Sequence, residues 1–250
     1  NSASNWVSLH LLHRIIWKKC AHLILPYTTK FYGVLPARVD FLENVYGLPK
    51  ERIELLVMGA DDEKVQMASD PNVRKRVRKK YGIGDEDFLI VTGGKIDMAK
   101  QQTVLLMKAI NQLHSTKIKL LVFGSVVPEL QEKVESECSE LVRYIGWVKS
   151  EDTYDYFAAA DLVAFPGRHS VFWEQVAGQG IPLLVKRWDG TDHVDMGSNV
   201  KFFENDSVEE IQKAISSVLQ IDNYNAMLDA AKRNSKYFMY SEIAKRSIKE

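Results

Sequence analysis

Six short apolar segments, each followed by a stretch with helical spacing, constrain the fold of this chain more than any other feature. The segments cover residues 88–94, 119–125, 141–147, 161–167, 181–186 and 199–203. Strands that are almost continuously apolar and alternate with helices form a parallel sheet that is covered on both faces. The pattern therefore predicts an α/β domain with a doubly wound, Rossmann-like, six-stranded parallel sheet.

The sequence on either side of this region predicts mostly helices. The first 20 residues, including Trp6, repeat apolar side chains at helical spacing, and the last 30 residues have a helical pattern throughout. Short apolar runs at 23–25 and 52–57 predict two strands. A helix is expected between them, with Thr28 or Thr29 as its cap.

A basic run at 74–80 ends one long charged helix that we predict over residues 63–80. Six of its seven residues are lysine or arginine, so a phosphate or an anionic lipid is one interpretation of the run. Acidic residues flank it, and the whole chain has no net charge. A solvent-exposed helix face is therefore the favoured interpretation.

Composition excludes several classes of protein. The 250 residues contain 33 lysines and arginines and 33 aspartates and glutamates, so no overall positive charge attracts nucleic acid. No apolar run approaches the roughly 20 residues that a membrane-spanning helix needs. Cys20 and Cys138 are far apart in the sequence, which indicates free thiols in a reducing compartment and a cytoplasmic location.

Ligands of doubly wound sheets bind at the carboxyl ends of the strands, and the first predicted strand ends in two glycines and two lysines. Gly93 and Gly94 let a ligand approach the backbone closely, and Lys95 and Lys100 suit a diphosphate. The alternative is that both lysines are ordinary solvated loop residues. Neither GxGxxG nor GxxxxGK[ST] follows any strand, which disfavours a dinucleotide site of the usual kind and a P-loop.

The second and third predicted strands also end in glycine. Gly124 follows the second strand, and Gly146 with Trp147 follows the third. Each glycine keeps the backbone clear of a cavity or, on the alternative interpretation, simply forms a turn.

The segment 166–182, after the fourth strand, contains several side chains that can bind a ligand. We expect His169 or Ser170 to cap the next helix, whose first amide groups can bind an anion. Glu174 lies about one turn inside this helix, where its carboxylate can accept hydrogen bonds from a sugar diol. The alternatives are that Glu174 complements the helix dipole and that His169 is a loop cap.

Together these segments resemble the donor-binding half of retaining glycosyltransferase family 4, which has the GT-B fold. That family carries a basic pair five residues apart after the first strand of its C-terminal domain, as Lys95 and Lys100 do here. Its signature of two glutamates eight residues apart, followed by a small residue, Gly and Pro, is matched in its second half by residues 174–182. Pro166 stands where the family has its first glutamate.

The resemblance implies roles for individual residues. Lys95 and Lys100 would stabilise the departing nucleoside diphosphate, and Glu174 would bind the ribose. His169, Ser170 and Val171 would replace the missing glutamate in contacts to phosphate and sugar. Thr191, in a segment that matches a Gly-Gly turn of the family, completes the expected donor site together with Gly93, Gly94, Gly124, Gly146 and Trp147.

The resemblance also implies a division of the chain. Residues 1–60 would be the end of an N-terminal acceptor domain with the linker, residues 61–222 the donor-binding domain, and residues 223–250 helices that cross back toward the N-terminal domain. The chain starts at Asn1 rather than at methionine, and we expect an enzyme that is incomplete without its N-terminal domain.

The expected function is transfer of a sugar from a UDP- or GDP-linked donor to a glycan or lipid-linked acceptor, with neither metal nor cofactor. Bacterial polysaccharide or cell-envelope biosynthesis would be its setting, in the cytoplasm or, with peripheral membrane association, at the inner face of the membrane. The oligomeric state stays open. Two alternatives remain: a sugar-nucleotide epimerase with the GT-B fold, which needs a pair of acid–base carboxylates, and a non-catalytic nucleotide-sugar-binding module.

Overall fold

The computed structural model describes residues 7–113 and 115–248, which fall into two compact units. The larger unit consists of residues 58–188 and 194–245. The smaller unit consists of the described residues up to Val57, together with the short segments 189–193 and 246–248. In the described part of the chain, no helix combines the length and the apolar character needed to cross a membrane.

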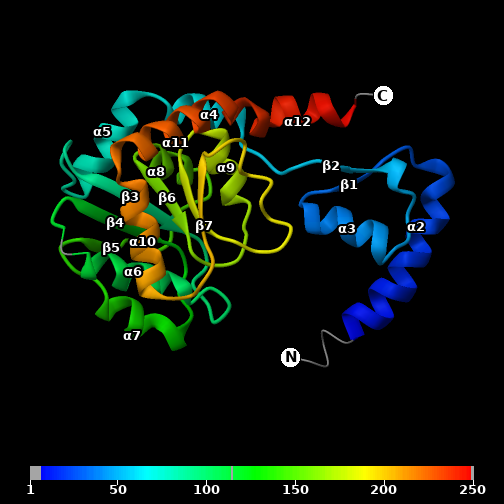
Figure 1. Cartoon of the computed structure of the whole chain (residues 1–250), viewed down its shortest axis with the longest axis horizontal. Coiled ribbons are helices and arrows are strands. Elements are labelled where there is room, and N and C mark those ends of the chain that lie inside the picture. The colour runs from blue at the N-terminus through cyan, green and yellow to red at the C-terminus, as the bar shows by residue number, and fades with distance from the viewer. Residues whose placement is uncertain (1–6, 114, 249–250) are drawn as a thin grey trace. The chain divides into compact units, whose positions relative to one another are not determined.

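The larger unit contains a six-stranded sheet in which every pair of neighbouring strands is parallel (Figure 1). Its strands are β3 (Phe88–Gly93), β4 (Ile118–Phe123), β5 (Val142–Tyr144), β6 (Leu162–Phe165), β7 (Leu183–Lys186) and β8 (Val200–Phe203). The strand order is β5-β4-β3-β6-β7-β8, so the chain winds outward in both directions from the β3–β6 pair. The predicted doubly wound six-stranded sheet is confirmed, and ligands of such sheets bind where the winding reverses.

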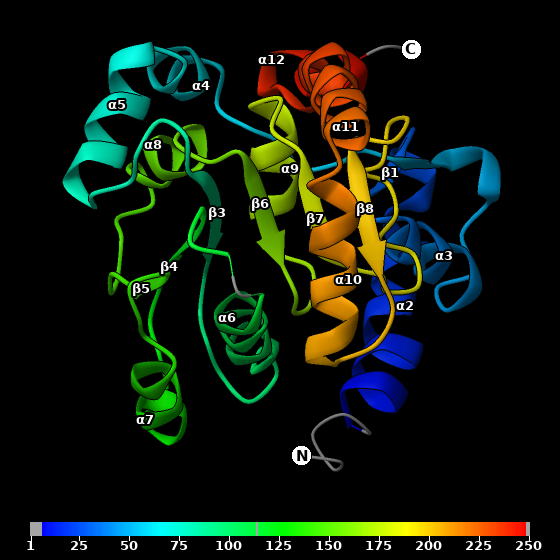
Figure 2. The same ribbon diagram turned by 60° about the vertical axis from the view of Figure 1, so that its left-hand side comes forward.

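Helices cover both faces of this sheet. The helices α6 (Gln102–Gln112), α7 (Pro128–Ser136) and α10 (Val208–Val218) share one apolar core with one face, and Figure 2 shows α6 and α10 on that side. The other face carries α8 (Thr153–Ala158) and α9 (Phe172–Gly178). The helices α4 (Asp62–Ala68), α5 (Pro71–Lys80) and α11 (Ile221–Asn234) pack against α8 and α9. The chain continues through η4 (Ser235–Phe238) into α12 (Tyr240–Ser247).

Alternation along each strand assigns its side chains to the two cores. On β4, Leu120 and Val122 join the core beneath α6 and α10, whereas the ring of Phe123 contacts aromatic side chains of α8 and α9. Both sets are almost completely buried. This explains why the strands have apolar residues at consecutive positions rather than at every second one.

The charged helix predicted over 63–80 is in fact two helices, α4 and α5. Pro71 is the first residue of α5, and Asp70 caps it by accepting the N–H of Asn72 at 2.9 Å. Proline disfavours a helical conformation in the residue before it and has no N–H to donate, so one continuous helix cannot pass through this position.

Two arginines of the basic run in α5 are structural, whereas its other four basic residues are exposed, as predicted. Arg74 donates to Oδ1 of Asp161 at 2.5 Å and to the carbonyl of Ala159 at 2.7 Å. Arg78 is only 3% exposed and donates to the carbonyls of Gly84 and Asp87. The interpretation of the whole run as a solvent-exposed face is therefore wrong for these two arginines, which attach α5 to the sheet.

The smaller unit has helices and one pair of short parallel strands. Its elements are η1 (Val7–Trp17), α2 (Lys18–Ile24), η2 (Leu25–Tyr27), β1 (Phe31–Gly33), α3 (Pro36–Asn44), η3 (Lys50–Arg52) and β2 (Ile53–Leu55). The predicted second strand is confirmed by β2, and the predicted first helix by η1 and α2, although Trp6 lies outside the described residues.

Two predictions for this unit are wrong. Residues 23–25 are helical rather than extended, because Pro26 is accommodated in the first turn of η2 and does not interrupt the helix. Thr28 and Thr29 do not cap α3, which begins at Pro36. The hydroxyl of Thr28 instead donates to the carbonyl of Ile24 at 2.9 Å, at the end of α2.

Candidate functional site

The carboxyl ends of β3, β4 and β6 surround a small hollow in the larger unit, at the point where the winding of the sheet reverses. Five of the residues that we predicted for ligand binding line it: Gly93, Gly94, Lys95, Lys100 and Ser170. They come from the last residue of β3, the β3–α6 loop and the β6–α9 loop. The structure thus brings together residues that are about 75 positions apart in the sequence, as expected for a site at a switch point.

The glycines at these strand ends are required by packing within the protein. A Cβ atom on Gly93 would lie 2.1 Å from the ring of Phe123, and one on Gly124 would lie 1.8 Å from the carbonyl oxygen of Gly94. Backbone hydrogen bonds join the same loops: the N–H of Gly94 donates to Phe123, and that of Gly124 donates to Gly146. The loops after β3, β4 and β5 therefore form one connected edge. At Gly94, by contrast, a Cβ would meet nothing closer than 3.8 Å.

An aromatic cluster lies beside this edge. The ring of Phe172, the first residue of α9, has its centroid 6.0 Å from that of Phe123 and 5.4 Å from that of Phe157. It also stacks against Phe165 at 6.4 Å. These apolar contacts come from β4, β6, α8 and α9, so they fix the start of α9 against the strand ends.

The two lysines differ in their surroundings. The Nζ atom of Lys95 lies 3.5 Å from Oδ2 of Asp97, and the Lys95 side chain is 62% exposed. Lys100 packs over Gly167, where a Cβ would come within 3.3 Å of the Lys100 Cγ atom. Lys100 therefore reaches across to the β6–α9 loop, whereas part of the charge of Lys95 is balanced by its neighbour.

Arg168 is a third cation of the hollow, and our sequence reasoning missed it. It is exposed, and its guanidinium carbon lies 5.8 Å from the ring centroid of Trp188. The indole Nε1 of Trp188 donates to the carbonyl of Gly167 at 3.2 Å. The position of Arg168 in the first loop residues after a buried strand was the available signal.

His169 and Glu174 form a close pair at the start of α9. The Nε2 atom of His169 lies 2.8 Å from Oε1 of Glu174, which is completely buried. The imidazole also packs edge-on against Trp173, with ring centroids 5.0 Å apart. Glu174 therefore already has a hydrogen-bonding partner within the protein.

The predicted cap of α9 is wrong. The N-cap residue is Val171, which has helical backbone angles and makes no side-chain capping bond. Ser170 contributes its carbonyl instead, which accepts the N–H of Trp173 at 3.0 Å. That amide of the first turn is thus satisfied by the backbone rather than by the side chain of His169 or Ser170.

The other predicted site residues do not line the hollow. Gly146 and Trp147 follow β5, the edge strand, where Gly146 faces open space and Trp147 is 69% exposed. Gly124 supports the neighbouring loop, as described above. Thr191 belongs to the smaller unit, in which the adjacent carbonyl of Gly190 accepts the N–H of Ala37 at 3.2 Å.

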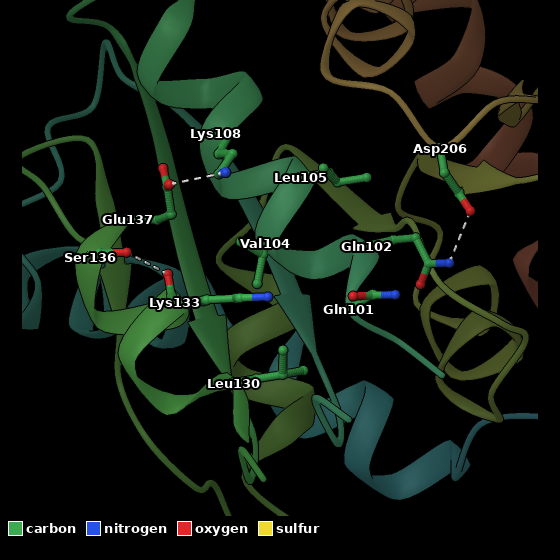
Figure 3. A pocket seen from close by; sticks show the side chains of 10 residues that line it. All are labelled: Gln101, Gln102, Val104, Leu105, Lys108, Leu130, Lys133, Ser136, Glu137 and Asp206. Atoms are coloured by element: carbon green, nitrogen blue, oxygen red, sulfur yellow. Dashed lines mark hydrogen bonds and ion pairs between the residues drawn. The ribbon is translucent and has the colours of Figure 1, made fainter. Parts of the chain in front are cut away.

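A second hollow lies between α6 and α7 (Figure 3). The ammonium group of Lys108 lies 3.8 Å from the carboxylate of Glu137 there, and the amide of Gln102 donates to Asp206 at 3.1 Å. Most of its polar groups are thus paired with one another. The hollow at the strand ends is the better candidate for an anionic ligand.

Residues 87–220 match the family described as "Glycosyl transferases group 1". The match covers more than half of the chain and includes the whole six-stranded sheet. The chain belongs to the glycosyl transferase group 1 family. The hollow at the strand ends is therefore the candidate site of a group 1 glycosyltransferase domain.

Two curated relatives and one solved structure show how this domain compares with longer proteins. Mannosylfructose-phosphate synthase of Agrobacterium fabrum is 25% identical over 68% of this chain and 38% of its own length. The GDP-mannose-dependent alpha-(1-6)-phosphatidylinositol monomannoside mannosyltransferase of Mycolicibacterium smegmatis is 22% identical over 74% of this chain and 52% of its own. The Anabaena protein HepE, solved in complex with UDP and glucose, has a TM-score of 0.69 and 14% identity, over 92% of this chain and 64% of that one.

The chain spans about a third to a half of the length of these two relatives. The larger unit has the α/β fold with a six-stranded, all-parallel sheet that is found in GT-B glycosyltransferase domains. A solved glycosyltransferase of Rickettsia africae has a TM-score of 0.74 and 14% identity, over 93% of this chain and 65% of that one.

Proposed function

We propose that this chain is the donor-binding part of a retaining, metal-independent glycosyltransferase that takes its sugar from a UDP- or GDP-linked donor. The observation that carries the proposal is the convergence of Lys95 and Lys100 on one hollow at the switch point of a group 1 glycosyltransferase domain. Phosphate groups carry the fixed negative charge of such a donor, and ammonium groups at a loop edge are suited to hold them.

The two lysines would act on the leaving group. When the bond between the anomeric carbon and the phosphate oxygen breaks, the electron pair stays on the phosphate, whose negative charge increases. Cations that are already in position stabilise this charge more in the transition state than in the bound donor. Lys100 is the better placed of the two, because Asp97 balances part of the charge of Lys95.

Glu174 would bind the hydroxyl groups of the ribose. Its Oε1 atom is engaged by His169 in the structure, so this contact requires the imidazole to share or release the carboxylate. Ser170 would add a hydroxyl group from the wall of the hollow. We propose His169, Ser170 and Val171 as the residues that meet the phosphate and the sugar at the start of α9.

The relatives support a sugar nucleotide as donor and a glycan or lipid-linked acceptor. By name, the mycobacterial enzyme uses GDP-mannose and acts on a phosphatidylinositol monomannoside, and HepE was solved with UDP and glucose. We propose a role in cell-envelope polysaccharide or glycolipid synthesis on this basis. The smaller unit would belong to the acceptor domain, and the acceptor contacts would come from parts of the relatives that this chain does not span.

One observation argues against the epimerase alternative. Among the described residues that line the hollow, none is an aspartate or a glutamate. A sugar-nucleotide epimerase with this fold needs a pair of acid–base carboxylates beside the sugar. The hollow offers lysines, an arginine and a serine instead.

Calorimetric titration with UDP, GDP and their sugar conjugates, followed by a hydrolysis assay, tests the proposal. Binding of one nucleoside diphosphate with slow release of the sugar is expected, and proton NMR of the first anomer formed reads whether the configuration is retained. Tight binding without any hydrolysis would favour a non-catalytic module. Absence of binding to every nucleotide would overturn the donor site altogether.

A further inference from the structure

We propose that Arg168 is a donor-binding residue that contacts the diphosphate, and that Trp188 is the residue that positions it. The inference rests on the proposed function and assigns to the β6–α9 loop a direct part in recognising the nucleoside diphosphate. Arg168 lines the same hollow as Lys95 and Lys100, but it comes from the opposite loop.

The charges around the hollow favour this assignment. Its lining carries three cationic side chains and no carboxylate among the described residues. Asp97 lies 3.5 Å from Lys95 and balances part of its charge. Each phosphate of a sugar nucleotide carries a negative charge, and the released diphosphate carries one more. Two lysines, one of them partly neutralised, leave a deficit of positive charge that Arg168 fills.

Lys100 and Arg168 are brought to one place by Gly167. Lys100 packs directly over this glycine, where any larger side chain would crowd its Cβ and Cγ atoms. Arg168 is the next residue along the chain. The two cations therefore flank the same backbone position and can approach neighbouring phosphate oxygens.

Trp188 holds the arginine in position. The guanidinium group lies over the indole ring, and the indole N–H is bonded to the carbonyl of Gly167. This cation–π contact uses none of the N–H groups of the guanidinium as hydrogen-bond donors, so they stay available to a phosphate. Lys186 also lies over this ring, 4.5 Å from its centroid, but its ammonium group is paired with Asp206 at 2.5 Å. Among the described residues, Arg168 forms no ion pair with a carboxylate.

This arrangement predicts selection for two phosphates over one. A planar fork can bridge oxygens of both phosphate groups, whereas a nucleoside monophosphate offers only one of them. Loss of Arg168 should therefore weaken the binding of a diphosphate much more than the binding of a monophosphate. Loss of the indole should have a smaller effect in the same direction, because the cation remains but is less ordered.

The test is calorimetric titration of the chain with UDP and GDP, and with UMP and GMP, for wild type and variants. We expect Arg168→Gln to lower the affinity for the diphosphate about tenfold and the affinity for the monophosphate about twofold or less. Arg168→Lys should recover part of the loss. Trp188→Leu should lower the affinity for the diphosphate severalfold. Trp188→Phe should lower it less, because phenylalanine keeps an aromatic face for the guanidinium group.

Arg187→Gln is the matched control. Arg187 neighbours Trp188 in sequence, is paired with Glu204 at 2.9 Å and does not line the hollow, so its loss should leave both affinities unchanged. If Arg168→Gln leaves the affinity for the diphosphate unchanged while Lys100→Gln lowers it, the role of Arg168 is overturned and the proposed function still stands. Failure of the wild-type chain to bind either diphosphate would overturn the proposed function as well. Thermal midpoints of the variants identify any loss that comes from misfolding.

Discussion

The Nε2 atom of His169 lies 2.8 Å from Oε1 of Glu174, at the start of the helix that borders the hollow. Glu174 has no exposed surface, and a buried carboxylate depends on its hydrogen bonds. The pair therefore links the β6–α9 loop, which carries Ser170 and Arg168, to the first turn of α9.

Replacement of His169 by phenylalanine removes this hydrogen bond while retaining a ring against Trp173. We expect the free energy of unfolding in urea to fall by about 1–3 kcal/mol, the usual cost when a buried polar group loses a partner. His169→Gln keeps an N–H donor at a similar distance from the backbone and should lose less. Equal losses in the two variants would show that packing, and not the hydrogen bond, makes the contribution.

Arg78 should be among the most sensitive positions in the larger unit. It is buried and donates to the carbonyls of Gly84 and Asp87 and to Asp161. Arg78→Met would leave the carbonyls of Gly84 and Asp87 without this donor, whereas Asp161 keeps Arg74, so we expect a cost of about 2–4 kcal/mol in urea unfolding. Lys79→Met, at the exposed next position, should change the stability by less than about 0.5 kcal/mol. A similarly small effect of both substitutions would contradict a structural role for Arg78.

Two glycines of the strand-end loops provide a matched pair. Gly124 has a φ of 129° and no room for a Cβ, whereas Gly146 has a φ of 77° and open space around it. Gly124→Ala should cost about 3 kcal/mol or more and displace the loop of Gly94, with loss of nucleotide binding. Gly146→Ala should cost only about 1–2 kcal/mol, from its left-handed backbone, and leave binding intact. Normal nucleotide affinity in Gly124→Ala would contradict the proposed packing of the loops.

Burial raises the pKa of Tyr224 from 10.0 to about 12, and the nearby charge of Asp161 adds to the shift. Between these two pH values the folded protein keeps a phenol proton that the unfolded chain releases. The contribution of Tyr224 to the free energy of unfolding should therefore be fully present below about pH 10 and be lost as the pH rises toward 12.

Tyr224→Phe tests this dependence on pH. Near pH 8 the variant should be less stable by about 1 kcal/mol, because it lacks the bond from the hydroxyl to the carbonyl of Asp161. The difference from wild type should shrink above pH 10. Tyr27→Phe, at a side chain that is 91% exposed, should leave the slope as in wild type. If the free energies of unfolding of Tyr224→Phe and wild type fall in parallel with rising pH, the raised pKa of Tyr224 is contradicted.

The sheet was predictable from the sequence because its strands are buried on both faces, so that each is a nearly unbroken apolar run. The short run at 23–25 shows the limit of this signal, since three apolar residues fit a helix as well as a strand. The break at Pro71 was available in the sequence and was overlooked.

The candidate site was predictable only in part. The spacing of Lys95 and Lys100 after a glycine-ended strand indicates a ligand-binding loop, and both line the hollow. The bond between His169 and Glu174 depends on the path of the loop between them, which no periodicity encodes. The contact of Arg168 with Trp188 joins residues 20 positions apart on different strand ends, and it required the three-dimensional structure.

We propose that the ammonium group of Lys100 holds the diphosphate of a sugar nucleotide. The most direct measurement is the calorimetric affinity of Lys100→Ala for whichever of UDP or GDP the wild-type chain binds. Lys117→Ala, which removes an exposed lysine just before β4 at the opposite end of that strand, is the control. We predict a loss of about tenfold or more in Lys100→Ala and no change in Lys117→Ala. An unchanged affinity in Lys100→Ala would show that Lys100 does not hold the diphosphate.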